Sequence, residues 1–387
     1  MEKNVTLLDD CEVAVIGAGI AGAGVAAHLE ARGGVVILDQ EGRAGHHSTG
    51  RSAAVFIQNY GNATIRALSR ASGHFYRGSG ATDFAAPLLS PRKILFVSDG
   101  EGRSHLDDLL SASEGLREIG VDEAIRAMPI LDPQWLAGAA IEDDASDIDV
   151  DAMHQGWLRR VRDGGGRILL DAPVNRAERR DGYWHLDTPK GRVRTRVVIN
   201  AAGAWADHVA SLCGSKPLGL VPMRRSIAVL PAPEGHDTRH WPLTADAADR
   251  WYVKPETGRL LVSPADEDPV EPHDAYVDDM VLAEGLHRFE QAVTMNVTRV
   301  ESSWAGLRTF APDRTPVAGF DPAAEGFFWL AGQGGYGIQS APALSLVAAA
   351  LLLGEAPQSG IDPATMAPDR TTIQDARAAA QPGGNHM

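Results

Sequence analysis

Short apolar runs on either side of a helical pattern dominate the first forty residues. Glu12–Ile16 and Val35–Leu38 are apolar and rich in β-branched residues, which is typical of strands buried on both faces of a parallel sheet. Between them, Ile20–Arg32 carries Ala, Val and Leu at helical spacing and stops at Gly33-Gly34, which predicts a helix with a glycine C-cap. We therefore expect a right-handed strand–helix–strand unit with parallel strands.

Similar patterns recur farther along the chain. Arg194–Asn200 and Gly326–Leu330 predict two more buried strands, and a helix is expected from about Ile338 to Leu353. Three segments have antiparallel character instead: Lys93–Val97, Ser226–Leu230 and Trp251–Pro264. The last of them contains PETG at 255–258, a plausible hairpin turn.

These elements predict an α/β fold with two interleaved domains. A dinucleotide-binding domain of the Rossmann type is expected from residues 1–75, 146–214 and 312–370. A mostly antiparallel sheet, the substrate domain, is expected from residues 76–145 and 215–311. Residues 371–387 contain no apolar anchor and are expected to form a loose C-terminal tail.

Composition narrows the classes of function. The chain has 387 residues, with 51 Asp and Glu against 36 Lys and Arg, and its net charge of −15 disfavours nucleic acid and anionic lipid as partners. Two cysteines cannot form a disulfide framework and fit a reducing cytoplasm. The longest apolar stretch, Ala341–Gly354, is too short to span a bilayer, and the N-terminus lacks the apolar run of a signal peptide. We expect a cytoplasmic protein without a membrane span that acts on a small molecule.

A glycine fingerprint follows the first predicted strand. Gly17, Gly19 and Gly22 form GxGxxG, and Asp39 ends the next strand, 22 residues after Gly17. In this pattern the glycines permit a tight turn, the close approach of a pyrophosphate to a helix N-terminus, and close helix–strand packing. Because Asp39 can accept hydrogen bonds from both ribose hydroxyls, the site favours FAD or NAD over NADP.

Two further segments carry candidate cofactor contacts. The loop HHSTGRSAA at 46–54 offers hydroxyls, backbone N–H groups and Arg51 to a phosphate or a flavin. We expect no metal at His46 and His47, because adjacent side chains diverge and no third ligand is spaced nearby. The junction GQGGYGIQ at 332–339 leads into a helix, whose N-terminus would stabilise negative charge on a flavin carbonyl. The alternative is a close helix–sheet crossing that needs small residues.

Arginines and tyrosines of the inserted sheet predict a carboxylate site. Arg225 lies at the start of a predicted strand and Arg308 closes SWAGLR. With Tyr60 and Tyr252 they could form a clamp of bidentate arginines and phenolic hydroxyls, while solvated arginines on a sheet surface are the alternative. The chain has no GxSxG, P-loop or HExxH motif, so hydrolase and kinase functions have no support.

Several motifs together resemble one superfamily. They are GAGIAGAGVAAHLEARG, HSTGRSAA, PLLSPR (87–92), VINAAGAW (198–205), SWAGLRTF (303–310) and EGFFWLAGQGGYGIQ (325–339). They are similar to those of the FAD-dependent D-amino-acid oxidase and glycine/sarcosine oxidase superfamily, and most of all to the bacterial D-arginine dehydrogenases. The resemblance covers residues from about 12 to 370 and implies a glutathione-reductase-type FAD-binding domain with an inserted substrate domain.

The resemblance also implies a chemistry. A hydride leaves the substrate Cα for flavin N5, and the imino acid formed is hydrolysed to a 2-oxo acid and ammonia. No cysteine stands where sarcosine oxidases link their flavin, so noncovalent FAD is expected. The electron acceptor, whether oxygen, a quinone or another compound, stays open.

Motifs and resemblance together give a set of candidate residues. The catalytic candidates are Arg225, Arg308, Tyr60, Tyr252 and Gly335. The cofactor-binding candidates are Gly17, Gly19, Ile20, Ala21, Gly22, Asp39, Gln40, Ser48, Thr49, Arg51, Ser52, Ala53, Ala54, Val174, Ala202, Gly203, Trp205, Arg308, Gly334, Gly335, Tyr336, Gly337, Ile338 and Gln339. The substrate-pocket candidates are Ala53, Val55, Ile57, Ala85, Leu243 and Gly306, and no metal ligand is expected.

Three pocket positions depart from the arginine-specific relatives. Those relatives have a glutamate, a histidine and a threonine where this chain has Ala85, Val55 and Ile57. Because a buried guanidinium without a partner is costly, an apolar D-amino acid is expected to be a better substrate than D-arginine. The alternatives are oxidation of a secondary or cyclic amino acid, a non-catalytic flavoprotein subunit, and an NAD enzyme, which the second glycine junction disfavours.

Overall fold

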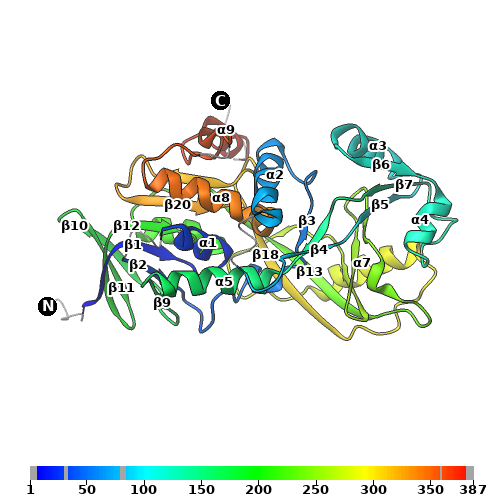
Figure 1. The fold of residues 1–387 in the computed structure, drawn as a ribbon, viewed down its shortest axis with the longest axis horizontal. Helices are drawn as coiled ribbons and strands as arrows, with labels where there is room; N and C mark the ends of the chain where they lie inside the picture. The colour runs from blue at the N-terminus through cyan, green and yellow to red at the C-terminus, as the bar shows by residue number, and fades with distance from the viewer. Residues whose placement is uncertain (1–6, 30–33, 79–83, 358–359, 381–387) are drawn as a thin grey trace, which may run out of the picture.

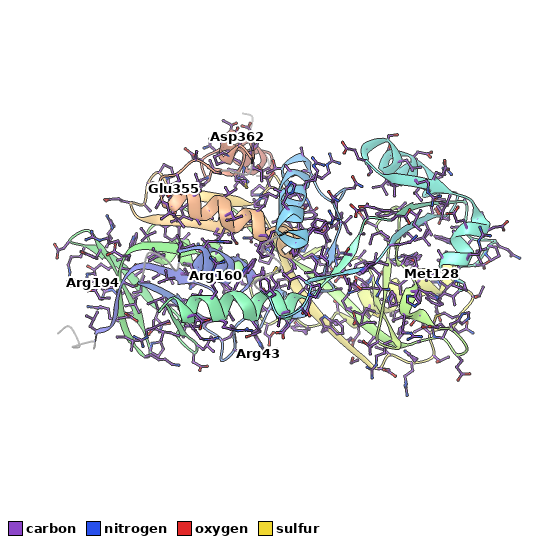
Figure 2. All side chains as sticks on the ribbon, viewed as in Figure 1. Arg43, Met128, Arg160, Arg194, Glu355 and Asp362 are labelled. Carbon is purple, nitrogen blue, oxygen red and sulfur yellow. The ribbon has the colours of Figure 1, made fainter. Side chains whose placement is uncertain are left out.

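Two large β-sheets lie side by side along the long axis of the molecule (Figure 1). The computed structural model describes residues 7–29, 34–78, 84–357 and 360–380. Figure 2 places Arg194, on the first sheet, near one end of the molecule and Met128, beside the second sheet, near the other. The helices are α1 (Ile20–Leu29), α2 (Ala63–Arg77), α3 (Arg103–Ala112), α4 (Val121–Ala127), α5 (Val150–Asp163), α6 (Ala206–Leu212), α7 (Asp279–Ala292), α8 (Gly337–Leu352) and α9 (Thr371–Ala380).

The first sheet has eight strands and a parallel centre. Its strands are β1 (Leu7–Ile16), β2 (Val35–Leu38), β9 (Arg167–Leu169), β10 (Arg176–Arg180), β11 (Tyr183–Thr188), β12 (Gly191–Asn200), β19 (Val317–Phe320) and β20 (Phe327–Ala331). β1 pairs in parallel with β2 and β12, β2 with β9, and β12 with β20. The predicted strand–helix–strand unit is therefore confirmed, as are the strands and the helix predicted near 194–200, 326–330 and 338–353. The predicted end of the first helix, at 30–33, lies outside the described residues.

Helices cover both faces of this sheet. On one face, α1, α5 and α8 bury apolar side chains against β1, β2 and β20, and α2 packs on α8. On the other face, α6 packs against β1, β12 and β20. Every residue of β2 and of β20 is buried. This burial on both faces is why an unbroken apolar run, rather than an alternating pattern, marks these strands in the sequence.

Helix α8 is unusually apolar. The stretch Gly334–Leu352 is long and apolar enough, by length and composition, to cross a membrane, but 67% of that window is buried within the protein. α8 lies between α1 and α2, and Val347 and Ala348 are fully buried. This burial is that of a core helix in a globular protein.

The second sheet has nine strands, and the described pairings are antiparallel apart from that of β14 with β5. Its strands are β5 (Ile94–Ser98), β6 (Leu116–Ile119), β7 (Gly138–Glu142), β13 (Val221–Pro231), β14 (Leu243–Asp246), β15 (Tyr252–Glu256), β16 (Arg259–Ser263), β17 (Asp268–Pro269) and β18 (Ser302–Phe310). The predicted hairpin is confirmed, with Thr257 and Gly258 at positive φ angles of 37° and 76°. Helices α4 and α7 pack on one face of this sheet, around Trp251 and Phe289.

A third, small sheet is formed by short strands that lie along the chain between strands of the two large sheets. It consists of β3 (Val55–Phe56), β4 (Leu89–Pro91) and β8 (Ser146–Ile148), with β8 in the middle. Immediately after β8, the carboxylate of Asp149 accepts a hydrogen bond from Ala152 N at 2.9 Å and caps α5. The predicted fold class is confirmed: a Rossmann-like α/β unit is interleaved with a mostly antiparallel sheet.

The expectation of a loose tail is wrong for its first part. Residues 371–380 form α9, and Ile373, which is 1% exposed, packs into the core under the first sheet. Thr372 Oγ1 donates a hydrogen bond to Asp313 Oδ2 at 2.6 Å. The segment therefore packs on the protein through one buried isoleucine and a side-chain hydrogen bond, contacts that the apolar pattern of the sequence did not indicate. Residues 381–387 lie outside the described residues.

Candidate functional site

The fingerprint glycines make the close contacts that their spacing predicts. Gly17 has a φ of +111°, and a Cβ there would overlap the carbonyl of Ala201, just after β12. A Cβ at Gly22 would overlap the carbonyl oxygen of Gly17, so this glycine lets α1 lie against the turn. A Cβ at Gly19 would lie 3.3 Å from the Thr49 hydroxyl oxygen. The turn therefore sits at the carboxyl ends of β1 and β12, where dinucleotides bind in doubly wound sheets.

Asp39 and His154 hold this turn from two sides. Asp39 Oδ2 accepts a hydrogen bond from Ala18 N at 2.6 Å, and its Oδ1 accepts one from Glu41 N at 2.9 Å. Burial raises the pKa of Asp39, although both N–H groups act to lower it. His154, on α5, donates from Nε2 to Ala18 O at 2.8 Å. Sequence analysis missed His154 because no motif links it to a turn that is 136 residues away.

Two adjoining cavities open at these strand ends. Their volumes are about 1070 Å³ and about 160 Å³, and they share Gly19, Ser48, Thr49 and Gly203 among their walls. The larger is lined by the candidates Gly17, Gly19, Asp39, Gln40, Ser48, Thr49, Val174, Ala202, Gly203 and Trp205. The smaller is lined by Gly19, Ile20, Ala21, Ser48, Thr49, Arg51, Ser52, Ala53, Gly203, Arg225, Tyr252, Gly306, Arg308, Gly334, Gly335, Gly337 and Ile338. Gly22, Ala54, Val55, Ile57, Tyr60, Ala85, Leu243, Tyr336 and Gln339 line neither of these two cavities.

The short helical turn Ser48–Arg51 connects the two sheets. The Ser48 hydroxyl donates to the carbonyl oxygen of Leu307 on β18. Thr49 Oγ1 accepts a hydrogen bond from Ile20 N at 3.0 Å. Ser48 and Thr49 also line both cavities, and each hydroxyl keeps a hydrogen-bonding role for a ligand, Ser48 as an acceptor and Thr49 as a donor.

Arg51 links this loop to neighbouring segments. Its Nη1 donates to the carbonyl oxygens of Ala275 and Ala305, at 3.0 Å each, and its Nη2 pairs with Asp274. Arg51 thereby fixes the loop to the second sheet while it also lines the smaller cavity. Its predicted cofactor contact stays a prediction.

The reasoning that excluded a third ligand near His46 and His47 is wrong. Their ring centroids are 4.8 Å apart, and Glu41 places a carboxylate oxygen within 4.8 Å of a nitrogen of each ring. His47 Nε2 lies 2.9 Å from Glu41 Oε1, and His46 Nδ1 accepts from Arg43 Nε at 2.9 Å. These hydrogen bonds account for the cluster, and we assign no metal to it.

The second glycine junction serves both packing and the site. Gly334 has a φ of +56°, and a Cβ there would overlap the Phe310 ring, as expected for a close crossing. A Cβ at Gly335 would lie 3.0 Å from Arg308 Nη1, so Gly335 makes room for that guanidinium. Gln339 is used internally: its Oε1 accepts from Ile57 N at 3.1 Å. The side-chain amide of Gln339 is therefore engaged within the protein, and its predicted flavin contact stays a prediction.

Strand register places Arg225 and Arg308 on one face of the second sheet. In the antiparallel pair β13–β18, Arg225 lies opposite Gly306 and Met223 lies opposite Arg308. The two arginines are thus diagonal neighbours on the face away from α7. The adjacent Arg224 points to the other face, where it pairs with acidic side chains.

The two arginines differ in their partners. Arg225 donates from Nε to Asp266 O at 2.7 Å and pairs through Nη2 with Glu267 Oε1 at 3.3 Å. Arg308 forms no ion pair with any residue that the structure describes. Burial acts to lower the pKa of Arg308, but Tyr252, Tyr60 and Glu267 outweigh it, and the net shift is upward. Arg308 therefore stays charged and has donors available to a ligand.

Motif analysis missed three charged residues beside this pair. Arg314 Nη2 contacts both carboxylate oxygens of Glu267, at 3.1 and 3.0 Å. Asp249 lies in the turn between β14 and β15 and keeps an exposed surface. Desolvation by the protein around it raises its pKa, and Arg225 and Arg308 act to lower it. No local pattern marks these residues, because only the tertiary structure brings them to the arginines.

Aromatic side chains border the site. The Tyr60 and Tyr336 rings pack edge to face, with centroids 4.8 Å apart. Burial raises the pKa of Tyr336 to about 12, so its hydroxyl keeps its proton at neutral pH. The guanidinium carbon of Arg225 lies 5.9 Å from the centroid of the Tyr252 ring. Tyr252 therefore lies near Arg225, whereas Tyr60 packs on Tyr336, and their part in binding a carboxylate stays a prediction.

The predicted apolar pocket is assembled only in part. Val55, Ile57 and Leu243 form one cluster with Ile94 and Tyr252. Ala85 does not join them. It lines a separate cavity against α5, where the neighbouring Phe84 ring packs on Gly156. The substrate-pocket role predicted for Ala85 is therefore not supported.

The fold and these cavities define a class of protein. The glycine turn leaves no room for a Cβ at the strand ends. The larger cavity, which Asp39 lines, adjoins a smaller cavity lined by Arg225 and Arg308. These features fit an extended dinucleotide whose far end reaches the second sheet. The protein is thus a dinucleotide-binding α/β protein with a ligand site between its sheets.

Comparison with known proteins gives the family. The family model described as FAD dependent oxidoreductase matches residues 12–351, and the chain belongs to that family. A bovine protein described as FAD-dependent oxidoreductase domain-containing protein 1 is 28% identical over 42% of this chain and 36% of its own length. The chain thus spans about a third of that relative. Glycine oxidase of Pseudomonas putida is 24% identical, covering 92% of this chain and 98% of that enzyme.

Solved structures show the same fold. The L-proline dehydrogenase from P. horikoshii superposes with a TM-score of 0.81 at 20% identity, covering 94% of this chain and 98% of that one. Glycine oxidase from Geobacillus kaustophilus gives a TM-score of 0.78 at 22% identity, over 94% and 99% of the two chains. At these identities the likeness shows the fold alone.

Proposed function

We propose that this protein oxidises the Cα–N bond of a free amino acid whose carboxylate is bound by Arg308 and Arg225. The observation that carries the proposal is the guanidinium of Arg308, which lines the smaller cavity and is left without an ion pair among the described residues. An arginine fork with open donors is suited to bidentate binding of a carboxylate. When bound, FAD accepts the hydride that leaves Cα. The chain binds the substrate, orients it and excludes water.

We infer that the FAD is held noncovalently. Cys11 and Cys213 are 5% and 6% exposed, within the core on one face of the first sheet. Burial raises the pKa of both thiols to about 12, which keeps them protonated and poorly nucleophilic. Acid precipitation should therefore leave free yellow flavin in the supernatant, whereas flavin that stays with the pellet would contradict this inference.

We propose an apolar D-amino acid as the substrate rather than D-arginine. Val55 and Leu243 are 9% and 8% exposed in the apolar cluster near Tyr252. These two residues line neither cavity, but Tyr252, which packs against them, lines the smaller cavity together with the apolar Ala53, Ile227 and Ile338. A Leu-sized side chain buried in that cavity would gain about 2–3 kcal/mol at ~25 cal/mol per Å². A guanidinium would gain less, because Glu267 already contacts Arg225 and Arg314.

A second candidate is oxidation of a small secondary or cyclic amino acid. The limited volume of the smaller cavity, about 160 Å³, favours a compact substrate. The similar proteins named for glycine and L-proline also support this candidate. Oxidation at Cα of a primary amine would yield ammonia after hydrolysis of the imine, whereas oxidation of an N-methyl amine at its methyl carbon would yield formaldehyde.

One screen tests both candidates. The FAD-loaded protein is mixed with D-, L- and N-methyl amino acids in the presence of a redox dye, so the assay does not depend on the natural acceptor. We expect D-leucine, D-methionine or D-phenylalanine to exceed D-arginine in kcat/KM by about tenfold or more, which corresponds to ~1.4 kcal/mol. D-Arginine or D-lysine as the best substrate would overturn the apolar assignment. Failure of every amino acid to bleach the flavin anaerobically would point to a non-catalytic flavoprotein.

A further inference from the structure

The carboxylate of Glu267 lies between two arginines at the edge of the site. One oxygen pairs with Arg225 Nη2 at 3.3 Å, and both pair with Arg314 Nη2 at 3.1 and 3.0 Å. Arg225 is the buried member of the group, with a side chain 10% exposed, while Glu267 and Arg314 are 34% and 45% exposed. One carboxylate is thus shared between an arginine of the candidate site and an arginine outside it.

The backbone beside Glu267 is held firmly. Asp266 accepts hydrogen bonds from Ser226 N at 2.7 Å and from Ser226 Oγ at 2.8 Å, and its carbonyl accepts from Arg225 Nε. Adjustment at this point therefore falls to the side chain of Glu267, the carboxylate that pairs with Arg225 among the residues that the structure describes.

Arg314 is the second partner of the Glu267 carboxylate. Its guanidinium carbon lies 3.9 Å from the centroid of the Phe310 ring, and its backbone has a positive φ of 58°. Its two contacts with Glu267 are also shorter than the contact from Arg225. A small rotation of the Glu267 side chain would complete the transfer to Arg314 and free the Nη2 of Arg225.

We propose that Glu267 is an internal carboxylate that competes with the substrate carboxylate for Arg225, and that Arg314 sets the strength of this competition by drawing Glu267 away. The proposal rests on the proposed function, because it assumes that Arg225 and Arg308 bind a carboxylate. Arg314 acts here as a positioning residue through Glu267. Substrate affinity is thereby tuned by a residue outside the arginine pair.

Carboxylate binding to three variants tests the proposal. Benzoate is titrated into the FAD-loaded protein, and Kd is taken from the change in flavin absorbance and, independently, from calorimetry. Glu267→Gln keeps a hydrogen-bonding amide but removes the negative charge, so it should lower the Kd by about tenfold. Arg314→Met should raise the Kd by about threefold or more, because Glu267 then pairs fully with Arg225. The double variant should bind as tightly as Glu267→Gln alone.

A purely structural role of Glu267 and Arg314 would give a different pattern of benzoate Kd values. Loss of local structure would weaken binding in both single variants, and their effects would add in the double variant; either result would overturn the proposal. Glu234→Gln, an exposed substitution just beyond the far end of β13, serves as the matched charge control and should leave the Kd unchanged. If the wild type binds benzoate but Glu267→Gln does not bind it more tightly, this inference alone fails. If the wild type binds no carboxylate and oxidises no amino acid, the proposed function fails and this inference with it.

Discussion

Replacing Arg308 by methionine should impair turnover more than the same change at Arg225. Arg225 donates a hydrogen bond from Nε to Asp266 O and pairs through Nη2 with Glu267, so fewer of its donors remain for a substrate. Arg308 has no ion-pair partner among the described residues, and Gly335 leaves space beside its guanidinium. A substrate carboxylate would therefore take its bidentate contact from Arg308.

The magnitudes follow from this difference. Loss of a charged, hydrogen-bonded contact costs about 2–5 kcal/mol, so Arg308→Met should lower kcat/KM by about 30- to 5000-fold, mainly through KM. Arg225→Met removes a donor set that is already partly used, and a cost of about 1–2 kcal/mol, or roughly 5- to 30-fold, is expected. Arg308→Lys should fall between them, since it keeps the charge but not the fork.

The assay is steady-state oxidation of the best amino acid with a redox dye. Bound FAD and the melting temperature are measured on each variant, so that loss of fold or cofactor is not counted as loss of substrate binding. If Arg225→Met were as damaging as Arg308→Met, the unequal clamp would be refuted. An Arg308→Met enzyme within a few-fold of wild type would remove Arg308 from substrate binding altogether.

Three other predictions concern the cofactor turn and the fold. Gly22→Ala should yield protein without flavin, because its Cβ would overlap the carbonyl oxygen of Gly17, whereas Gly100→Ala, with nothing within 4 Å of its Cβ, should keep normal absorbance at 450 nm. Burial lowers the pKa of His154, so the unfolded chain accepts a proton at this residue more readily than the folded protein does, and stability is lost as the pH falls below about 6.5. Melting temperatures at pH 7.5 and 5.5 should therefore differ less in His154→Gln than in wild type. Equal differences in the two proteins would contradict this. Ile373→Ala should destabilise the protein by about 2–4 kcal/mol in urea unfolding; the exposed Asp375→Ala is the control, and an equal effect of both would show that Ile373 does not anchor α9.

The sequence by itself determined the parts of this protein whose contacts are local or whose burial is complete. β2 and β20 are buried on both faces, so their unbroken apolar runs were sufficient evidence. The glycine turn is also local, because the carbonyl that excludes a side chain at Gly22 belongs to Gly17, within the same motif. The tertiary structure then added His154, which braces this turn from a distant helix.

Only the tertiary structure decided how the substrate side of the site is built. The sequence places Arg224 and Arg225 side by side on one strand, so they point to opposite faces, but only the pairing of β13 with β18 decides that Arg225 shares its face with Arg308. Ala85 resembled a pocket position by motif, but its segment packs on α5 and lines a different cavity. Glu267 and Arg314 meet across 47 residues, in a contact that no local pattern encodes. The physical reason is that sheet register and loop packing fix which side chains share a space, and both depend on contacts between segments far apart in the chain.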